Sequence, residues 1–407
     1  MTRASSPAGP LPAESNDPRT LTAGVLFLLA ALAALGALAT NIILPAFPAM
    51  SADLGVPVRD LGATLSSFFL TVALGQLFVG PLSDRFGRLR LVLFGLAVFV
   101  IGSLLCAVAT TLPQFIGGRV VQALGVCATS VLSRAIARDL FDGQELARAL
   151  SLTMVAMAAA PGFSPLMGSA FSSLLGWRST FLVISALALV LAVAYFTKLG
   201  ETHAPAQRSA LSVVAIAVGY KQLALDRRLM APALSVSLVI GTLYAFFPLA
   251  PGVLITGFGL SPLNFGLFFA STTIVVFGSG VLAPRLAKRW GPVGAARAGV
   301  AIALVGSAAM LVGKADFVSF SVSLTIFLFG MGIFNPLGTA IALQPFAQRA
   351  GAASALLGFL QMGCAALAIT FGGMLTLPTY TALGVVLSTS LLAASLCFWS
   401  IRPTTGN

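Results

Sequence analysis

Charged side chains are scarce in this sequence. Only 8% of its 407 residues are charged, while 58% are hydrophobic. A soluble domain carries roughly a quarter charged residues, because water must solvate its surface. A chain with so little charge cannot cover the surface of a soluble fold of this length. The shortage therefore excludes a soluble multidomain protein.

Metal-binding and catalytic side chains are equally few. The sequence has a single histidine, His203, in a polar interval. Its four cysteines lie in apolar segments without paired spacing, which is typical of packing residues rather than of a disulfide framework or a metal site. An enzyme within a membrane would need a nucleophile, a base or a metal cluster at one depth, and no such set occurs. We therefore expect no enzymatic activity, no metal and no cofactor.

Long apolar runs occupy most of the chain. Each run is about 20 residues long, enough for a helix to cross a hydrocarbon core of ~30 Å. A membrane β-barrel would show shorter segments of alternating polarity instead. The sequence predicts an all-α membrane protein with twelve spanning helices, near residues 22–44, 62–82, 91–110, 114–136, 148–172, 179–197, 230–253, 264–283, 293–313, 317–340, 353–376 and 380–400.

The basic residues indicate the topology. The formal net charge is +12, but with a cytoplasmic N-terminus the outer loops contain only Arg59, Arg178 and Lys314, and Arg119 falls within a span. The other basic residues lie at or near the inner face, as the positive-inside rule requires. We therefore expect a multi-pass monomer in a bacterial-type inner membrane, with the lipid bilayer around it and both termini in the cytoplasm. Topology accounts for the positive charge, so no nucleic-acid partner is expected.

The longest polar interval divides the spans into two sets of six. Its apolar stretch LSVVAIAV (211–218) is too short to span and is expected to lie on the cytoplasmic surface as an interfacial helix. PLSDRFG (81–87) aligns with RLAKRWG (285–291), which indicates a duplication and a central cavity between two halves. The expected organisation is a disordered tail at 1–20, an N-terminal half at 21–197, a linker at 198–229, a C-terminal half at 230–401 and a short tail at 402–407.

One loop between spans carries a distinctive charge pattern. The pattern G-x-L-x-D-R-x-G-R within GPLSDRFGRLR (80–90) is formed by Gly80, Leu82, Asp84, Arg85, Gly87 and Arg88. It resembles the signature loop of the major facilitator superfamily. The resemblance implies that the Asp84 carboxylate caps the eleventh helix near Ala352 and Ala353, and that Arg88 reaches Asp139. These contacts would form a latch that closes the cytoplasmic side. An ordinary basic loop would explain the arginines, but not Asp84 between two glycines.

Other motifs narrow the resemblance. RVVQALG (119–125) resembles a fourth-helix motif, R-x-x-Q-x-x-G, and RAIARDLF (134–141) is similar to its continuation in the Bcr/CflA group of drug:proton antiporters. The group likeness implies a secondary transporter that exports small amphipathic drugs or antibiotics by alternating access, with protons as the coupling ion. Weaker matches are GWRSTF (176–181), ET (201–202), RAGAASALLGFLQM (349–362) and AAPGFSPLMGSAF (159–171), where Pro161, Pro165 and Gly168 are expected to permit a kink.

The first span departs from that group. In TNIILPAFP, Asn41 stands where the group typically has an aspartate that serves as a proton and cation site. None of the eleven acidic residues lies deep within a span. An amide keeps the shape and hydrogen bonds of a protonated carboxyl but cannot titrate. Coupling to protons is therefore in question, and a metabolite or siderophore carrier on the same fold is the alternative function.

Arg119 is a charged residue that falls within a predicted span. Such an arginine costs several kcal/mol unless it is paired or hydrated, so we expect it to serve the transport site with Gln122 and Asn41 as neighbours. The alternative is a side chain that snorkels to the outer interface. A channel would need a continuous polar lining, which few spans provide. Further candidates for the cavity, which packing could also explain where they are aromatic, are Gln76, Tyr244, Phe246, Phe247, Asn335 and Gln361.

Overall fold

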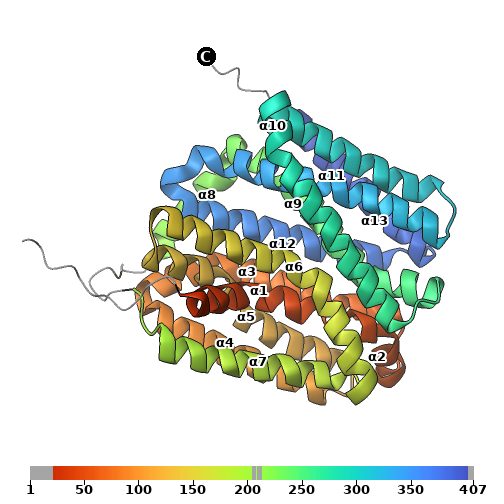
Figure 1. The fold of residues 1–407 in the computed structure, drawn as a ribbon, viewed down its shortest axis with the longest axis horizontal. Helices are drawn as coiled ribbons and strands as arrows, with labels where there is room; N and C mark the ends of the chain where they lie inside the picture. The colour runs from red at the N-terminus through yellow and green to blue at the C-terminus, as the bar shows by residue number, and fades with distance from the viewer. Residues whose placement is uncertain (1–21, 204–207, 209–212, 402–407) are drawn as a thin grey trace, which may run out of the picture.

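The computed structural model describes residues 22–203, 208 and 213–401, and this part of the chain contains helices and no strands. The helices run roughly alongside one another in a single bundle (Figure 1). In chain order they are α1 (Ala23–Asn41), η1 (Leu44–Ala46), α2 (Phe47–Leu54), η2 (Val58–Leu61), α3 (Gly62–Phe86), α4 (Arg88–Val108), α5 (Leu112–Leu140), α6 (Gly143–Leu175), α7 (Arg178–Lys198), α8 (Val213–Leu225), α9 (Arg227–Pro251), η4 (Gly252–Gly257), α10 (Pro262–Val312), α11 (Phe317–Leu343), η5 (Gln344–Arg349), α12 (Ala350–Met374) and α13 (Thr379–Trp399).

Polar residues at the helix starts set several of these boundaries. The Thr22 hydroxyl accepts from the amide of Val25 at 3.3 Å, just before the Ala- and Leu-rich α1. Asp316 accepts from the amide of Ser319 at 2.8 Å at the start of α11. These side chains pair amides that have no partner within the helix, which is why the helices begin at these residues.

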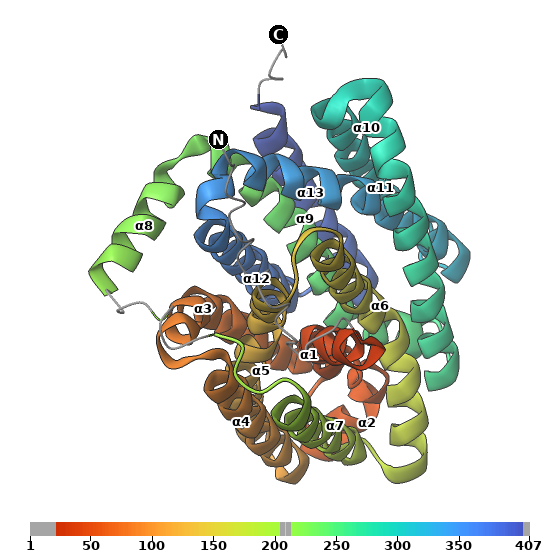
Figure 2. The ribbon, with the colours of Figure 1, turned by 60° about the vertical axis from the view of Figure 1, so that its left-hand side comes forward.

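The spanning helices match the sequence prediction. In the described residues, eleven helices are long and apolar enough to cross a membrane. One of them, α10, has 51 residues and breaks at Gly291, whose φ of 73° and ψ of 159° are not helical. The chain reverses there (Figure 2), so α10 supplies two of the predicted spans. The all-α fold with twelve crossings is therefore confirmed.

Two local boundaries differ from the prediction. The first helical segment does not end near residue 44 but continues through η1 and α2 to Leu54, because Pro45 and Pro48 lie in the first turns of those helices, where a proline is tolerated. The stretch 211–218, expected to be an interfacial helix, overlaps α8, which begins at Val213 and extends to Leu225; residues 211–212 lie outside the described residues, and the interfacial position stays a prediction. Both tails, at 1–20 and 402–407, also lie outside them.

The two sets of six spans meet along two helix pairs. Helix α3 packs against α12, and α6 packs against α10. We call the end with Gly87, Phe141 and Leu199 the inner end, following the predicted topology, and the opposite end the outer end. At the outer end η1 also contacts α9 and α10. No hydrogen bond or ion pair in the described structure joins residues 22–198 to residues 227–401. The two sets are therefore held together by apolar packing.

Candidate functional site

A buried arginine lies within the N-terminal set of helices. Arg119, on α5, is 0% exposed. Its Nη1 donates to the carbonyl oxygen of Ala39 at 3.2 Å and to Oε1 of Gln122. The ring of Phe68 lies under the guanidinium, 4.4 Å from its central carbon. In the described structure no carboxylate forms an ion pair with Arg119, and its Nε and Nη2 have no hydrogen-bond partner.

This geometry bears on the two expectations for Arg119. A snorkelling arginine directs its charged head toward the membrane surface. Here the guanidinium is enclosed by α1, α3 and α5 instead, which is not a snorkelling arrangement; the role in transport stays a prediction. The charge is offset by a backbone carbonyl, an amide oxygen and an aromatic face. A cation–π contact of this kind contributes about 0.5–2 kcal/mol.

Gln122 connects Arg119 to a neighbouring helix. The Gln122 amide Nε2 donates to the Ser103 hydroxyl at 2.7 Å, and that hydroxyl donates to the carbonyl oxygen of Phe99 at 2.8 Å. All members of this chain of hydrogen bonds are buried. Because Ser103 and Phe99 belong to α4, the network fixes Arg119 relative to both α4 and α5.

Asn41 lies at the end of α1 and is 0% exposed. Its Nδ2 donates to the carbonyl oxygen of Ala37 at 2.8 Å and to the Thr40 hydroxyl at 3.1 Å. Its Oδ1 has no partner in the described structure. Asn41 and Arg119 share no hydrogen bond there, and α1 reaches the guanidinium through the Ala39 carbonyl instead.

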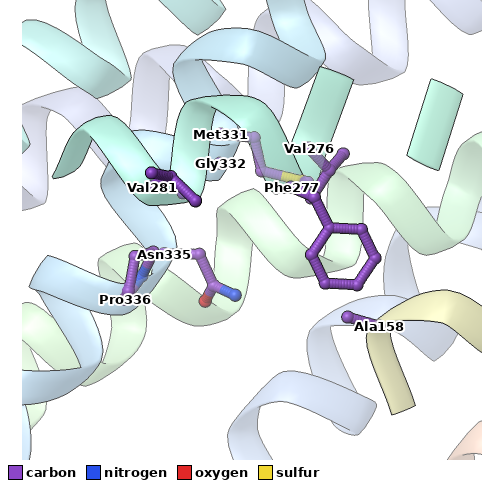
Figure 3. A pocket seen from close by; sticks show the side chains of 9 residues that line it. Ala158, Val276, Phe277, Val281, Met331, Gly332, Asn335 and Pro336 are labelled. Carbon is purple, nitrogen blue, oxygen red and sulfur yellow. The ribbon is translucent and has the colours of Figure 1, made fainter. Parts of the chain in front are cut away.

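An open cavity of about 270 Å³ lies where α6 meets α10 and α11, with Val281 and Pro336 exposed at its edge. Its walls come from α6, α10 and α11, and the Asn335 side chain points into it (Figure 3). Asn335 Oδ1 has no hydrogen-bond partner among the described residues. The rest of the lining is apolar or backbone, and consists of Ala158, Val276, Phe277, Gly280, Val281, Met331, Gly332 and Pro336.

Two backbone carbonyls of this cavity also lack their usual helical donors. Proline has no N–H, so Pro336 cannot donate to the carbonyl of Gly332, four residues earlier, and Pro284 cannot donate to that of Gly280. The Gly332 oxygen faces Gly280, since a methyl group added there would lie 3.9 Å from it. Asn335 Oδ1 and the Gly332 oxygen thereby place hydrogen-bond acceptors beside the apolar lining.

The remaining cavity candidates do not line this space. Gln76 packs its amide oxygen against Gly358, at the contact between α3 and α12. Tyr244 packs its ring 4.6 Å from that of Phe69. Gln361 is half-buried on α12. Phe246 and Phe247 are buried in an aromatic cluster around Phe269, which agrees with the packing interpretation.

The inner end holds the charge cluster of the signature loop. Arg88, whose side chain is 8% exposed, binds Asp84 through Nη1 at 2.7 Å and Asp139 through Nε at 2.9 Å. Thr202 also donates to the Asp139 carboxylate, at 3.2 Å. Arg88 therefore links the ends of α3 and α5, as the resemblance implied for Asp139. Arg85 is exposed beside it, and a methyl group on Gly80 would meet nothing within 4 Å.

The expected cap of the eleventh helix is not made in this structure. The N-terminal residue before α12 is Arg349, and no side chain caps the helix there. The Asp84 carboxylate instead accepts a hydrogen bond from Arg88, the first residue of α4, and its side chain is 46% exposed. The Asp84 carboxylate is already paired with Arg88 and partly solvated, so a contact with α12 is not needed to satisfy its charge.

Glu201 performs such a capping role at another helix. Its carboxylate accepts from the backbone amide of Arg88, the first residue of α4, at 2.8 Å, and from Arg208 at 3.4 Å. An anion at this position is favoured by the partial positive charge of a helix N-terminus. Gly87 permits the contact, because its φ of 90° is unusual for other residues and a side chain there would collide with Glu201. The sequence feature that contains Glu201 is the ET match at 201–202, and that match does not indicate a capping role.

Helix α6 is continuous from Gly143 to Leu175 through both Pro161 and Pro165. Each proline removes one backbone hydrogen bond without ending the helix. Gly168 allows α6 to contact the backbone carbonyl of Ile42, and Gly162 allows it to contact Thr273 of α10. Gly168 therefore brings α6 close to its own N-terminal set, and Gly162 brings it close to the C-terminal set.

Comparison with known proteins places this arrangement in a family. The family model described as Major Facilitator Superfamily matches residues 29–369. The solved D-xylose-proton symporter shares the fold, with a TM-score of 0.71, 18% sequence identity, and coverage of 93% of this chain and 98% of the other.

Named relatives include several resistance proteins. The chain is 27% identical to the multidrug resistance protein D of Escherichia coli (strain K12), over 93% of this chain and 96% of that one. It is 28% identical to a bicyclomycin resistance protein homolog of Haemophilus influenzae, over 85% and 86%, and 29% identical to the chloramphenicol resistance protein of Pseudomonas aeruginosa, over 70% and 67%. The likeness to Bcr/CflA-type proteins is thereby confirmed. The chain belongs to the Major Facilitator Superfamily, and it is a multi-pass membrane transporter rather than an enzyme.

Proposed function

We propose that this transporter exports small amphipathic molecules that carry hydrogen-bond donors, drugs and antibiotics among them. The observation that carries the proposal is the cavity between α6, α10 and α11, where Asn335 Oδ1 and the Gly332 oxygen lie beside an apolar lining. Such acceptors are costly to leave unpaired away from water, so they favour a ligand with O–H or N–H groups on an apolar body. The names of the resistance-protein relatives support the same substrate class.

Alternating access is part of the proposal. The outer ends of the two sets of helices are in contact, through η1 with α9 and α10. At the inner end Asp84 is not bonded to α12. We therefore assign the present state as one that is open toward the inner side. Apolar packing between the sets allows them to separate without breaking buried ion pairs.

The coupling ion is proposed to be the proton, and the coupling is proposed to be weak because Asn41 replaces the first-helix acid. Asn41 makes the hydrogen bonds that a protonated carboxyl would make to Ala37, and it cannot release a proton. We propose that the chain, with Asn41 at this position, binds and moves substrate but responds weakly to a proton gradient. The inner-membrane location and cytoplasmic termini follow from the basic residues and belong to the same proposal.

The experiment uses the purified chain in liposomes, with chloramphenicol and its diacetate, in which the hydroxyl groups are acetylated. We expect chloramphenicol to exchange across the membrane and the diacetate to do so about tenfold more slowly, because an unpaired buried acceptor costs roughly 1–3 kcal/mol. Asn335→Leu should slow exchange of chloramphenicol and reduce the difference between the two compounds. Asn264→Leu, at an exposed position outside the cavity, is the matched control.

Equal exchange of the two compounds would contradict a requirement for hydroxyl donors, since the amide N–H is the donor that both compounds keep. Exchange of neither compound, in liposomes where the protein is shown to be folded, would contradict drug export and leave a metabolite or siderophore carrier as the better function.

A further inference from the structure

A proline in α3 leaves one backbone oxygen without its helical donor. Pro81 lies inside α3 and has no N–H, so the carbonyl of Leu77, four residues earlier, cannot form its usual bond. In a membrane protein such a carbonyl must find another donor or cost several kcal/mol. The Tyr220 hydroxyl donates to it at 3.1 Å. A phenol of the linker helix thus replaces a missing backbone amide.

Helix α8, which carries Tyr220, is otherwise attached to the C-terminal set of helices. Leu223 is 2% exposed and packs in a cluster with residues of α9, α11 and α12, among them Leu229, Ala342 and Ala353. Gln222 accepts from Arg349, the residue before α12, at 3.0 Å. The linker helix therefore moves with the C-terminal set.

The bond to Leu77 is the link from this helix to the other set. Within the described residues, it is the hydrogen bond that joins the segment 213–401 to residues 22–198. Burial raises the pKa of Tyr220, so the phenol stays neutral and able to donate at physiological pH. Below that raised pKa its contribution does not change with pH.

We propose that Tyr220 is a positioning residue that ties α8 to α3 and favours the state in which the inner ends are apart. This proposal rests on the alternating access proposed above: closing the inner end requires the last turns of α3, beyond its contact with α12 at Gly358, to approach the start of α12, which Asp84 does not contact here. Since α8 is packed on α9 and α12, that movement displaces Leu77 relative to Tyr220. The proline-exposed carbonyl is then paired in one state and unpaired in the other, which shifts the equilibrium between them.

The test measures the distance between spin labels on cysteines introduced at Phe86 and Gln348, both exposed at the inner end, in a full-length chain whose own four cysteines are replaced. Tyr220→Phe removes the hydroxyl and keeps the ring. We expect the population with short distances to rise about two- to tenfold, the value of one hydrogen bond. Tyr380→Phe is the matched control, because its hydroxyl also donates to a backbone carbonyl, that of Lys314 at 3.2 Å, but within one set.

A second variant separates this mechanism from a general packing effect. Pro81→Ala restores an N–H that can pair Leu77 within α3, so in that background Tyr220→Phe should shift the distances much less. An equal shift in both backgrounds, or no shift from Tyr220→Phe alone, overturns the proposal. The readout is a distance, so it is independent of the substrate proposed above.

Discussion

The surroundings of Arg119 set what this residue can do. A buried guanidinium presents five donors, and only Nη1 is paired in the described structure. The Phe68 ring supplies an electron-rich face on the side of α3. A cation held by a carbonyl, an amide and a ring leaves donors unused, which is what the expected role of Arg119 in transport requires. A carboxylate partner would have occupied those donors permanently.

Replacement of Arg119 tests that role. Arg119→Lys should lower the transport rate at least tenfold, because a compact ammonium cannot reproduce the planar fork that binds Gln122 and the Ala39 carbonyl together. Arg119→Ala should abolish transport. Both variants should reach the membrane, which quantitative blotting of membrane fractions would check. Normal transport by Arg119→Ala would mean that the residue is structural.

The sequence could identify Arg119 but not its neighbours Phe68 and Ser103. An arginine in an apolar run is visible as an exception to the composition. The ring that covers it and the hydroxyl that anchors Gln122 come from α3 and α4, and their meeting depends on how those helices are rotated against α5. Spacing within one helix does not determine that rotation.

The inner-end charge cluster joins the ends of several helices. Arg88 draws α3 and α5 together through Asp84 and Asp139, and Glu201 holds the start of α4. The motif made Asp84 and Arg88 visible in the sequence. Glu201 was not assigned, because it lies 113 residues from the amide that it binds and only the folded chain brings them together.

Burial predicts unequal effects within this cluster. The Asp139 side chain is 18% exposed and that of Asp84 is 46% exposed. Asp139→Asn should lower the free energy of unfolding by about 1.5–3 kcal/mol, because it weakens a charged hydrogen bond to a buried arginine. Asp84→Asn should cost less than about 1 kcal/mol, since solvent screens that pair. Thermal unfolding in detergent would measure both, and a larger loss for Asp84→Asn would contradict the order.

The arrangement of the whole molecule was predictable to the level of spans. Apolar runs of membrane length gave the crossings, and even the pair merged in α10 was separated in the sequence by the charged stretch that ends at Gly291. The contact of the outer ends was not predictable. Two states of a transporter differ by only a few kcal/mol, and the same sequence must be compatible with both. In the proposed alternating-access cycle, the missing cap by Asp84 would be a property of this state.

Asn41 is the position at which the proposed weak coupling to protons can be tested. Burial disfavours a charged carboxylate, so the acid of Asn41→Asp should hold its proton more tightly than in water unless Arg119 opposes this. Its protonated form could make the Asn41 bond to Ala37, and its ionised form would lose that bond and attract Arg119. We expect uptake by Asn41→Asp into inside-out vesicles to depend steeply on an imposed pH gradient, while the unaltered chain responds weakly. Asn264→Asp, at an exposed position, should leave the weak response unchanged. Full gradient-driven accumulation by the unaltered chain would instead assign coupling to a group at the inner end, with Asp84 and Asp139 as the first to replace.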